Sequence, residues 1–354
     1  MSPPCSPIPR SPIDRRAAPA ALPLPRATGA DGPAVSGDRP FAWIVTDGVV
    51  GMENQCVGLV ERIGMAFAVK RIAVEKPWRW VPPLLIPRPL SHLAPRGDQL
   101  SPPWPDLLVA SGRKSVAPAL AIRRAARGAC FCVQIQNPGV NPARFDMVVA
   151  PAHDGLAGDN VVATTGSLHG LSRAGLDEAA QAWRASVSHL PEPRIAVLVG
   201  GANRAYRFGP EEARALGRSL AALPGGLMVT VSRRTGAEAT RALAESLDPA
   251  RAILWEGQGD NPYRGWLGLA DAIVVTADSV NMATEACVTG RPVLVAHLPG
   301  GSPKFSAFHG LMEAQGHTRR FEGVLPDWTP VPLDETGRVA ELVRQRMQAR
   351  AALK

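Results

Sequence analysis

Short apolar runs alternate along this chain with longer stretches in which apolar residues recur every three or four positions. Residues 41–46 form the first run, and Cys56, Leu59 and Ile63 then follow at the spacing of one helical face. Gly64 stands where such a helix would end, because glycine tolerates the left-handed conformation of a helix C-cap. The runs are apolar throughout, which is typical of strands that helices cover on both faces.

The same pattern predicts the remaining elements and starts again near residue 191. Pro210 with two following glutamates favours a helix start, since proline fits the first helical position and acids stabilise the first turn. The further strands that we expect are 66–74, 106–110, 130–136, 146–150, 160–164, 194–199, 226–232, 251–255, 272–276 and 292–297. The further helices that we expect are 173–188, one from 210, 236–247, 262–270, 279–289, 304–316 and 335–351.

Strands that alternate with helices predict parallel sheets in an α/β protein. The restart of the pattern after Pro-Glu-Pro at 191–193 predicts two doubly wound domains that face each other. A ligand would then lie in the cleft outside the carboxyl ends of the strands. We expect an N-terminal domain over 41–190, a C-terminal domain over 191–334 and a last helical segment over 335–354.

The composition of residues 1–40 differs from that of the rest of the chain. This segment has ten prolines, many Ala and Ser, and almost no aromatic residue. It cannot bury enough apolar surface to offset its chain entropy, and it lacks the apolar core of a secretory signal. We expect a disordered tail, or a segment that precedes the true start of translation. No stretch of 18 apolar residues follows, which excludes a membrane-spanning helix.

The net charge of +8 comes mostly from arginine, since only five of the 39 basic residues are Lys. The basic residues are spread along the chain, so a compositional bias explains them more readily than attraction to an anionic membrane surface or a phosphorylated ligand. No basic stripe carries aromatic residues, so we expect no nucleic-acid partner. The five scattered cysteines fit neither a disulfide scaffold nor a metal site. We expect buried thiols in a reducing cytoplasm, no metal and no cofactor.

The strongest local signal is residues 275–286, where a buried strand ends, a tight turn follows and a helix begins. Asp278 or Ser279 would cap this helix. The free N–H groups and the dipole at its start would suit a phosphate. Asp278, Asn281 and Glu285 share one helical edge, which places Glu285 to accept hydrogen bonds from ribose hydroxyls. A capped helix with an exposed glutamate explains the same spacing.

Two neighbouring strand ends carry glycine or arginine. Gly200 and Gly201 open a loop that is longer than the usual strand–helix connection of about 2–6 residues, and paired glycines let the backbone approach a ligand. Arg204 in this loop is placed to pair with a phosphate, as are Arg233 and Arg234 after the next strand. Solvated charged side chains are the alternative. The pattern is not G-x-G-x-x-G, so no nicotinamide site is indicated.

The turn at 46–55, after the first strand, is where an acceptor would lie in a two-domain cleft. Asp47 or Glu53 in this turn would serve as general base, with ordinary helix capping as the alternative reading. His153, followed by Asp154 at another strand end, is a further candidate base. The candidate acceptor-binding residues of the turn are Gly48, Gly51 and Asn54.

Residues 75–88 mix Trp78, Arg79 and Trp80 with aliphatic residues in a stretch broken by prolines. Tryptophan with arginine is favoured at a membrane interface, although a loop packed across a domain surface explains the same residues. Contact with lipid would point to a lipid-linked ligand. The Gly-Arg-Lys-Ser sequence at 112–115 lacks the earlier glycine of a phosphate-binding P-loop, and we reject that site.

Taken together, these motifs resemble a known family, the one named for the plant "elongated mitochondria" fission factor. The resemblance covers about residues 41–325, and its most specific part is the Thr-Ala-Asp-Ser stretch at 276–279. Met52 departs from the polar residue expected beside Glu53. The segments that carry the resemblance are Asp47-Gly48, Gly51, Glu53-Asn54-Gln55, Gly58-Leu59, Ser232-Arg233-Arg234-Thr235, Asn261-Pro262-Tyr263, 270–280, Lys304-Phe305 and Phe308-His309.

The resemblance implies a GT-B-like architecture of two Rossmann-like domains, since bacterial members are generally labelled glycosyltransferases or nucleotide-sugar epimerases. The C-terminal half is also similar to the donor domain of lipid-linked glycosyltransferases such as the peptidoglycan precursor enzyme. By that similarity Ser279 and Val280 would hold the diphosphate and Glu285 the ribose. Asn261, Tyr263 and Lys304 enter the expected donor site on the resemblance alone.

Three functions follow as expectations. The first is transfer of a sugar from a nucleotide-diphosphate sugar to a cell-envelope or lipid-linked acceptor, by a cytoplasmic protein at the inner face of the membrane. The second is epimerisation of a nucleotide sugar on the same scaffold, without an acceptor. The third is a non-catalytic adaptor at a membrane surface, which is what the plant fission role suggests. Family membership does not by itself establish an activity.

Overall fold

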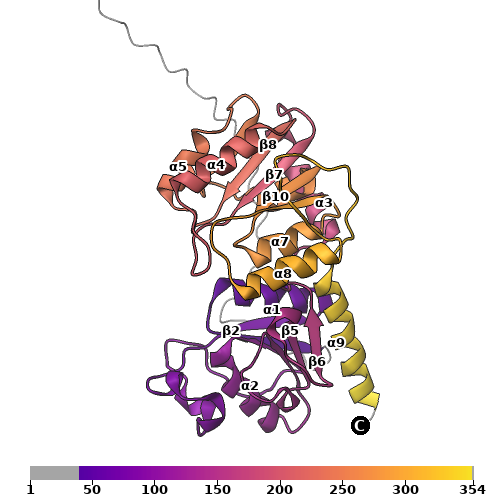
Figure 1. Ribbon diagram of the computed structural model, residues 1–354. Helices are drawn as coiled ribbons and strands as arrows, with labels where there is room; N and C mark the ends of the chain where they lie inside the picture. The colour runs from indigo at the N-terminus through magenta and orange to yellow at the C-terminus, as the bar shows by residue number, and fades with distance from the viewer. Residues whose placement is uncertain (1–39, 353–354) are drawn as a thin grey trace, which may run out of the picture.

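The computed structural model describes residues 40–352, and within them the chain forms two α/β domains stacked one on the other (Figure 1). The tail predicted over residues 1–40 lies outside this described range, except for residue 40. The N-terminal sheet has six parallel strands in the order β2-β1-β3-β4-β5-β6. These strands are β1 (Phe41–Thr46), β2 (Ala66–Arg71), β3 (Leu107–Ser111), β4 (Phe131–Ile135), β5 (Met147–Pro151) and β6 (Val161–Thr164).

The C-terminal sheet also has six parallel strands, in the order β12-β11-β10-β7-β8-β9. Its central strands are buried except at Arg194, as expected for continuous apolar runs covered on both faces. The strands are β7 (Arg194–Val199), β8 (Gly226–Val231), β9 (Ala252–Trp255), β10 (Ala272–Thr276), β11 (Val293–Ala296) and β12 (Arg319–Arg320). The two sheets confirm the predicted α/β fold of two Rossmann-like, doubly wound domains.

Nine α-helices connect the strands within the described residues. The first, α1 (Val50–Ile63), ends at Gly64, which has φ 82° and donates its N–H to the last turn, as predicted. The others are α2 (Arg113–Ala125), α3 (Arg173–Trp183), α4 (Pro210–Ala221), α5 (Ala237–Ala244), α6 (Tyr263–Leu269), α7 (Val280–Cys287), α8 (Pro303–Ala314) and α9 (Glu335–Ala352). None of the described helices is both long enough and apolar enough to cross a bilayer.

Two elements were not predicted. Helix α2 contains Pro118 and four basic residues, so its helical period is weak in the sequence, although its apolar side is buried on the sheet. Strand β12 has only two residues and pairs with the edge of its sheet. The predicted strand 66–74 ends earlier, at Arg71, and short 3-10 turns at 78–80, 83–85 and 89–92 follow it, where prolines interrupt regular structure.

Two helices pack on the domain opposite to the one suggested by their place in the sequence. Leu176 and Ala180 of α3 belong to the core of the C-terminal sheet, and α3 lies against α6. Val339 and Val343 of α9 belong instead to the core of the N-terminal sheet, where α9 lies along α1 (Figure 1). The sequence-based boundary at 190 assigned 173–188 to the N-terminal side, whereas its apolar face completes the other core.

The chain therefore crosses between the domains twice, at about 165–172 and again at about 321–335. The two crossings are bonded to each other. The Thr336 hydroxyl accepts a hydrogen bond from the His169 N–H and donates one to the His169 carbonyl oxygen, both at 3.0 Å. Beside them, the Arg62 guanidinium pairs with Asp334 at 3.1 Å and donates to the Leu171 carbonyl oxygen at 3.4 Å.

The strand orders place one reversal of winding direction in each sheet, between β1 and β3 and between β7 and β10. In open α/β sheets, ligands bind outside the carboxyl ends of the strands at such a point. Asp47 follows β1, Gly200 follows β7 and Asp278 follows β10. These three predicted site residues thus lie at the two positions where this fold favours a ligand.

Candidate functional site

The reversal point of the C-terminal sheet is held together by Asp278. Its carboxylate is buried, with Oδ1 accepting from the Thr276 hydroxyl at 2.7 Å and Oδ2 from the Gly201 N–H at 3.0 Å. The Thr276 hydroxyl oxygen in turn accepts from the Gly200 N–H at 2.8 Å. A Cβ atom on Gly200 would lie 2.1 Å from Asp278 Oδ2, so only glycine leaves room for this carboxylate. The carboxylate fixes the glycine turn against the start of α7.

The turn after β8 closes the same network. Arg234 lies 2.8 Å from Asp278 Oδ2 through Nη2, and the hydroxyls of Ser232 and Thr235 donate to the Gly200 carbonyl oxygen. Arg234 is therefore committed to Asp278. Arg233 beside it is exposed and makes no ion pair within residues 40–352. The structure thus leaves Arg233 available to an anion.

The start of α7 presents unpaired backbone donors. Ser279 is the N-cap, and its hydroxyl accepts from the Met282 N–H at 3.3 Å, as predicted. The N–H groups of Val280 and Asn281 have no acceptor among the described residues. Together with the helix dipole, such groups attract an anion. Arg204, in the loop after Gly201, is exposed near the same reversal point.

Glu285 lies one helical turn or more beyond these donors and is not free. It accepts a hydrogen bond from the Tyr263 hydroxyl at 2.5 Å. Burial raises the pKa of Glu285 above its usual value, against the smaller opposite effects of the Tyr263 bond and of Arg264. Asn261 accepts from the Tyr263 N–H at 3.0 Å and so starts the helix that carries Tyr263. Asn261, Tyr263 and Glu285 thus form one bonded group beside α7.

In the N-terminal domain, the two candidate carboxylates at the start of α1 are each paired with a cation. Asp47 Oδ2 lies 2.8 Å from Lys114 Nζ, while its buried Oδ1 has no hydrogen-bond partner in the described structure. Glu53 accepts two hydrogen bonds from Arg71, at 2.8 and 2.6 Å. Glu53 therefore has both oxygens occupied, whereas Asp47 keeps one that is available for a proton.

His153 is buried where the two domains meet. Its ring stands edge-on to Phe308 of α8, with centroids 5.9 Å apart, and its Nδ1 has no partner among the described residues. Burial lowers the pKa of His153, and the nearby Lys304 cation lowers it further against the opposite effect of Asp154. Lys304 Nζ lies 2.8 Å from Asp154 Oδ1. Lys304 thus joins α8 to the N-terminal domain beside the His153 imidazole.

Helices α1 and α7 approach each other with their N-termini. A Cβ atom on Gly51 would lie 3.6 Å from Nδ2 of Asn281. Gly48 has φ 80°, a conformation that favours glycine, and its N–H donates to the Thr46 hydroxyl at 3.2 Å. Asn54 is exposed on the outer side of the first turn of α1. The acceptor-side and donor-side turns predicted from the sequence therefore meet at this contact.

Several residues of these networks were not predicted as site residues. Asn203 accepts from the N–H groups of Ala205 and Tyr206 and donates to the Asp278 carbonyl oxygen at 3.2 Å. His309 is buried, and its Nε2 lies 2.8 Å from the Ala277 carbonyl oxygen. Asn203 follows the Gly-Gly pair and is the only one with a local signal, since asparagine favours turns. Lys114 and Arg71 find their carboxylates through the fold alone.

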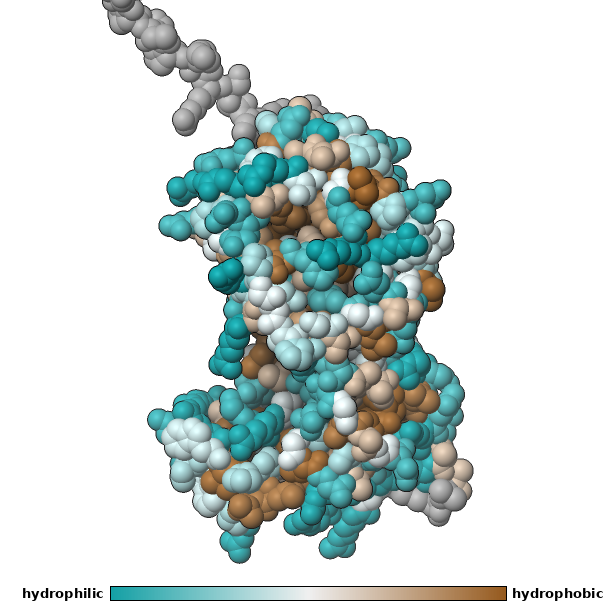
Figure 2. All heavy atoms as spheres, viewed as in Figure 1, coloured by the Kyte–Doolittle hydropathy of each residue, from teal (hydrophilic) through white to brown (hydrophobic). Residues whose placement is uncertain are grey.

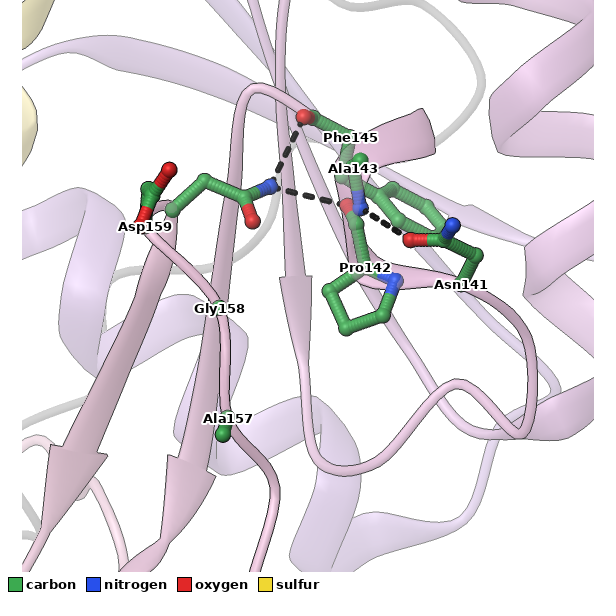
Figure 3. Close-up of a pocket in the computed structure, with 8 residues that line it drawn as sticks. Asn141, Pro142, Ala143, Phe145, Ala157, Gly158 and Asp159 are labelled. Atoms are coloured by element: carbon green, nitrogen blue, oxygen red, sulfur yellow. Dashed lines mark hydrogen bonds between the residues drawn. The ribbon is translucent and has the colours of Figure 1, made fainter.

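The predicted site residues do not line the pocket shown in Figure 3. This pocket, of about 410 Å³, lies at the amino ends of β5 and β6, the edge of the sheet opposite to Asp47 and His153. The Asn160 side-chain amide crosses it and donates to the carbonyl oxygens of Pro142 and Phe145, at 2.8 and 3.0 Å. These bonds tie two loops together. The described residues contain no cluster of three or more His, Cys, Asp or Glu side chains that could hold a metal ion.

Comparison with solved structures finds partly similar proteins at low sequence identity. MurG from Acinetobacter baumannii is 14% identical, with a TM-score of 0.46 over 88% of this chain and 93% of that one. A glycosyltransferase from Rickettsia africae ESF-5 is 9% identical, with a TM-score of 0.47 over 88% and 89%. UDP-GlcNAc 2-epimerase from Methanocaldococcus jannaschii is 10% identical, with a TM-score of 0.45 over 86% and 99%. The fold described above rests on the two sheets themselves.

Comparison with curated proteins finds two relatives. The "Mitochondrial fission protein ELM1" of Arabidopsis thaliana is 35% identical over 276 residues, which are 70% of this chain and 65% of that protein. This chain thus spans just under two thirds of the plant protein's length. "Uncharacterized protein RP120" of Rickettsia prowazekii (strain Madrid E) is 24% identical over 287 residues, which are 68% of this chain and 79% of that protein. The profile described as "Mitochondrial fission ELM1" matches residues 50–347, and the chain belongs to this family.

Proposed function

We propose that the protein is a glycosyltransferase that moves a sugar from a nucleotide-diphosphate sugar to an acceptor. The observation that carries the proposal is the meeting of the two reversal points. The free N–H groups of Val280 and Asn281 lie beside the fixed Gly200–Gly201 turn, and Asn281 approaches Gly51 of α1. A donor on one domain would thus face an acceptor on the other.

The donor diphosphate would lie at the start of α7. Its negative charge increases when the bond between the sugar and the diphosphate breaks, and donors already aimed at that position stabilise it without rearrangement. Arg204 in the loop after Gly201 and Arg233 in the turn after β8 are exposed cations, and Arg234 supports the glycine turn through Asp278. Glu285 would accept hydrogen bonds from the ribose hydroxyls in place of the Tyr263 hydroxyl.

The acceptor hydroxyl would lie at the start of α1 and lose its proton as its oxygen bonds to the sugar carbon. Of the three candidate bases, Asp47 and His153 each have an unpaired atom, whereas Glu53 is held by Arg71 at both oxygens. Val49 and Val50 beside Asp47 are 46% and 59% exposed. Apolar surface at this point supports an acceptor with an apolar part, such as a lipid-linked envelope precursor.

A thermal-shift panel of nucleoside diphosphates and nucleotide sugars tests the donor site. A ligand present at about 100 times its dissociation constant adds about 2.7 kcal/mol to the free energy of unfolding. We expect stabilisation by one nucleotide, its loss in Glu285→Ala, and its retention in Glu245→Ala, which removes an exposed carboxylate of the same domain. The absence of stabilisation by every nucleotide at millimolar concentration would refute the donor site.

The two remaining functions differ from this one in what they require. An epimerase would convert the sugar of the bound nucleotide without an acceptor, which sugar analysis of the incubated donor detects. A membrane adaptor would keep its function when Glu285 is replaced. The name of the plant relative and the exposed tryptophan of the N-terminal domain favour keeping the adaptor as the second candidate.

A further inference from the structure

One end of the N-terminal domain exposes large apolar side chains. Trp80, Leu84 and Leu85 are 58%, 46% and 68% exposed, although residues of these types are normally buried. Trp80 lies on the first of the short 3-10 turns between β2 and β3, and Leu84 and Leu85 lie on the second, which packs against α2. Figure 2 shows hydrophobic side chains gathered at the lower end of this domain and bordered by hydrophilic ones. Nothing in the described part of the chain covers them.

Arginines adjoin these apolar residues. The second turn, the chain that follows it and α2 enclose a pocket of about 460 Å³, whose lining includes Leu84, Arg88, Arg124 and Arg144. Arg123, also in the lining, is held by Asp146 through two hydrogen bonds. The three other arginines are exposed, and none of them is paired with a carboxylate within residues 40–352. The pocket therefore carries uncompensated positive charge.

Arg88, which lines this pocket, has a strained backbone conformation. Arg88 has φ 45° and ψ 59°, in the left-handed region that a residue with a side chain seldom adopts. Prolines on both sides, Pro87 and Pro89, restrict the chain there. Strain of this kind persists where the surroundings fix it and is concentrated at functional positions. The strained residue is one of the three unpaired arginines.

The first 3-10 turn, at 78–80, also places positive charge beside apolar surface. The Arg79 guanidinium lies over the Trp80 ring at 4.4 Å from its centroid, and Lys76 Nζ lies 6.0 Å from it. An indole with an apolar body beside cations is the arrangement favoured where lipid headgroups meet acyl chains. Residues 76–92 contain no acidic residue.

We propose that this basic apolar face, defined as Trp80, Leu84, Leu85, Arg88, Arg124 and Arg144, docks on an anionic phospholipid bilayer. The arginines would pair with headgroup phosphates while the leucines and the indole enter the interface below them. A bilayer presents phosphate and hydrocarbon side by side, which matches the side-by-side placement of pocket and apolar tips, whereas an acidic protein would match the charge alone. The proposal is independent of the proposed sugar transfer, which involves the opposite ends of the strands.

Sedimentation with sucrose-loaded vesicles tests the face in the full-length protein. We expect binding to phosphatidylcholine vesicles that contain phosphatidylglycerol, weak binding to phosphatidylcholine alone, and weaker binding as salt rises. Arg124→Glu with Arg144→Glu should lower the partition coefficient at least tenfold, and so should Leu84→Ser with Leu85→Ser. Arg214→Glu with Arg218→Glu, on exposed α4 of the other domain, makes the same change in net charge and should have little effect.

The outcomes separate this docking face from its alternatives. Equal loss in the α4 variant would mean attraction by net charge alone and would overturn the proposal. Loss in the arginine variant without loss in the leucine variant would mean that charge alone holds the protein at the vesicle and would overturn it too, as would no binding to anionic vesicles. Unchanged melting temperatures of the variants confirm that they fold. An unchanged thermal shift with nucleotides separates failure of this face from failure of the donor site.

Discussion

The carboxylate of Asp278 accepts a hydrogen bond at 3.0 Å from the backbone N–H of Gly201, a residue that follows a different strand of the sheet. The same oxygen pairs with Arg234, and the other oxygen accepts from Thr276. Asp278 thus has no oxygen left as a simple ligand for an incoming group. Its contribution to a donor site is to hold the glycine turn and the second arginine in place.

Loss of the Asp278 carboxylate should destabilise the protein markedly. We expect Asp278→Ala to lower the free energy of unfolding by about 2–4 kcal/mol, because it leaves the Gly201 N–H and the Thr276 hydroxyl without acceptors and Arg234 without its partner. Urea unfolding measures the change. Asp260→Ala, at an exposed aspartate of the same domain, should stay within about 0.5 kcal/mol. An equal effect of both variants would contradict the role assigned to Asp278.

A methyl group on Gly200 should have a similar cost for a steric reason. The added Cβ would lie 2.1 Å from the buried carboxylate, so the turn or Asp278 must move. Overpacking of this kind costs about 1–3 kcal/mol. Gly310→Ala is the matched control, because nothing lies within 4 Å of its Cβ position on exposed α8, and alanine favours helix there. Thermal denaturation should show a lower melting temperature for the first variant and an equal or higher one for the second.

Glu285 should make the stability depend on pH. Burial raises its pKa in the folded state above the value of 4.5 expected in the unfolded state, so the unfolded chain releases this proton first as pH rises. The free energy of unfolding should therefore fall from about pH 4.5 upward until the folded-state pKa is passed, by about 1.4 kcal/mol for each tenfold difference in proton affinity. Urea unfolding of Glu285→Gln between pH 5 and 8 should lack this component.

Glu245→Gln controls for the loss of one negative charge at an exposed position. If the difference in free energy of unfolding between the wild type and Glu285→Gln stays constant over this pH range, Glu285 does not titrate as its burial implies. Since ribose hydroxyls would bond to the ionised carboxylate, nucleotide affinity should rise over the same pH range in the wild type and in Glu245→Gln, but not in Glu285→Gln.

The four cysteines in the described residues should resist modification in the folded protein. All are buried and free, and burial raises the pKa of the Cys130 thiol to about 12 and the pKa of Cys56, Cys132 and Cys287 above its usual value. Thiolates are the reactive form. In a Cys5→Ser variant at pH 8, we expect slow reaction with a disulfide reagent in the folded state and four equivalents in denaturant. Rapid reaction of a folded-state thiol would show that the segment around it opens readily.

Most of the fold could be predicted because strands such as β1 and β10 are short, continuous apolar runs bounded by turn residues. Helix α2 could not, since Pro118 and its arginines obscure a helical period that burial reveals only in three dimensions. Periodicity also identifies which face of α3 or α9 is apolar, without indicating which sheet that face will cover. Both helices therefore pack on a domain that their place in the sequence did not suggest.

At the candidate site, the sequence located the strand ends but not the ion pairs. Gly200, Asp278 and Ser279 are recognisable because glycine and helix-capping residues directly follow predicted strands. The pairing of Asp47 with Lys114 and of Glu53 with Arg71 depends on strand order, which no local pattern contains. Glu285 was predicted to contact ribose, a prediction that stands untested beside its bond to Tyr263.

The double crossing of the chain between the domains limits how one domain can move on the other. The two connections are hydrogen-bonded to each other through Thr336 and His169, so they would move together as a single hinge. Twisting or sliding of one domain on the other would break those two bonds, whereas bending about this hinge would preserve them. The two domains would then separate most at the edge far from this hinge, and the ion pair between Lys304 and Asp154 would have to break for them to open.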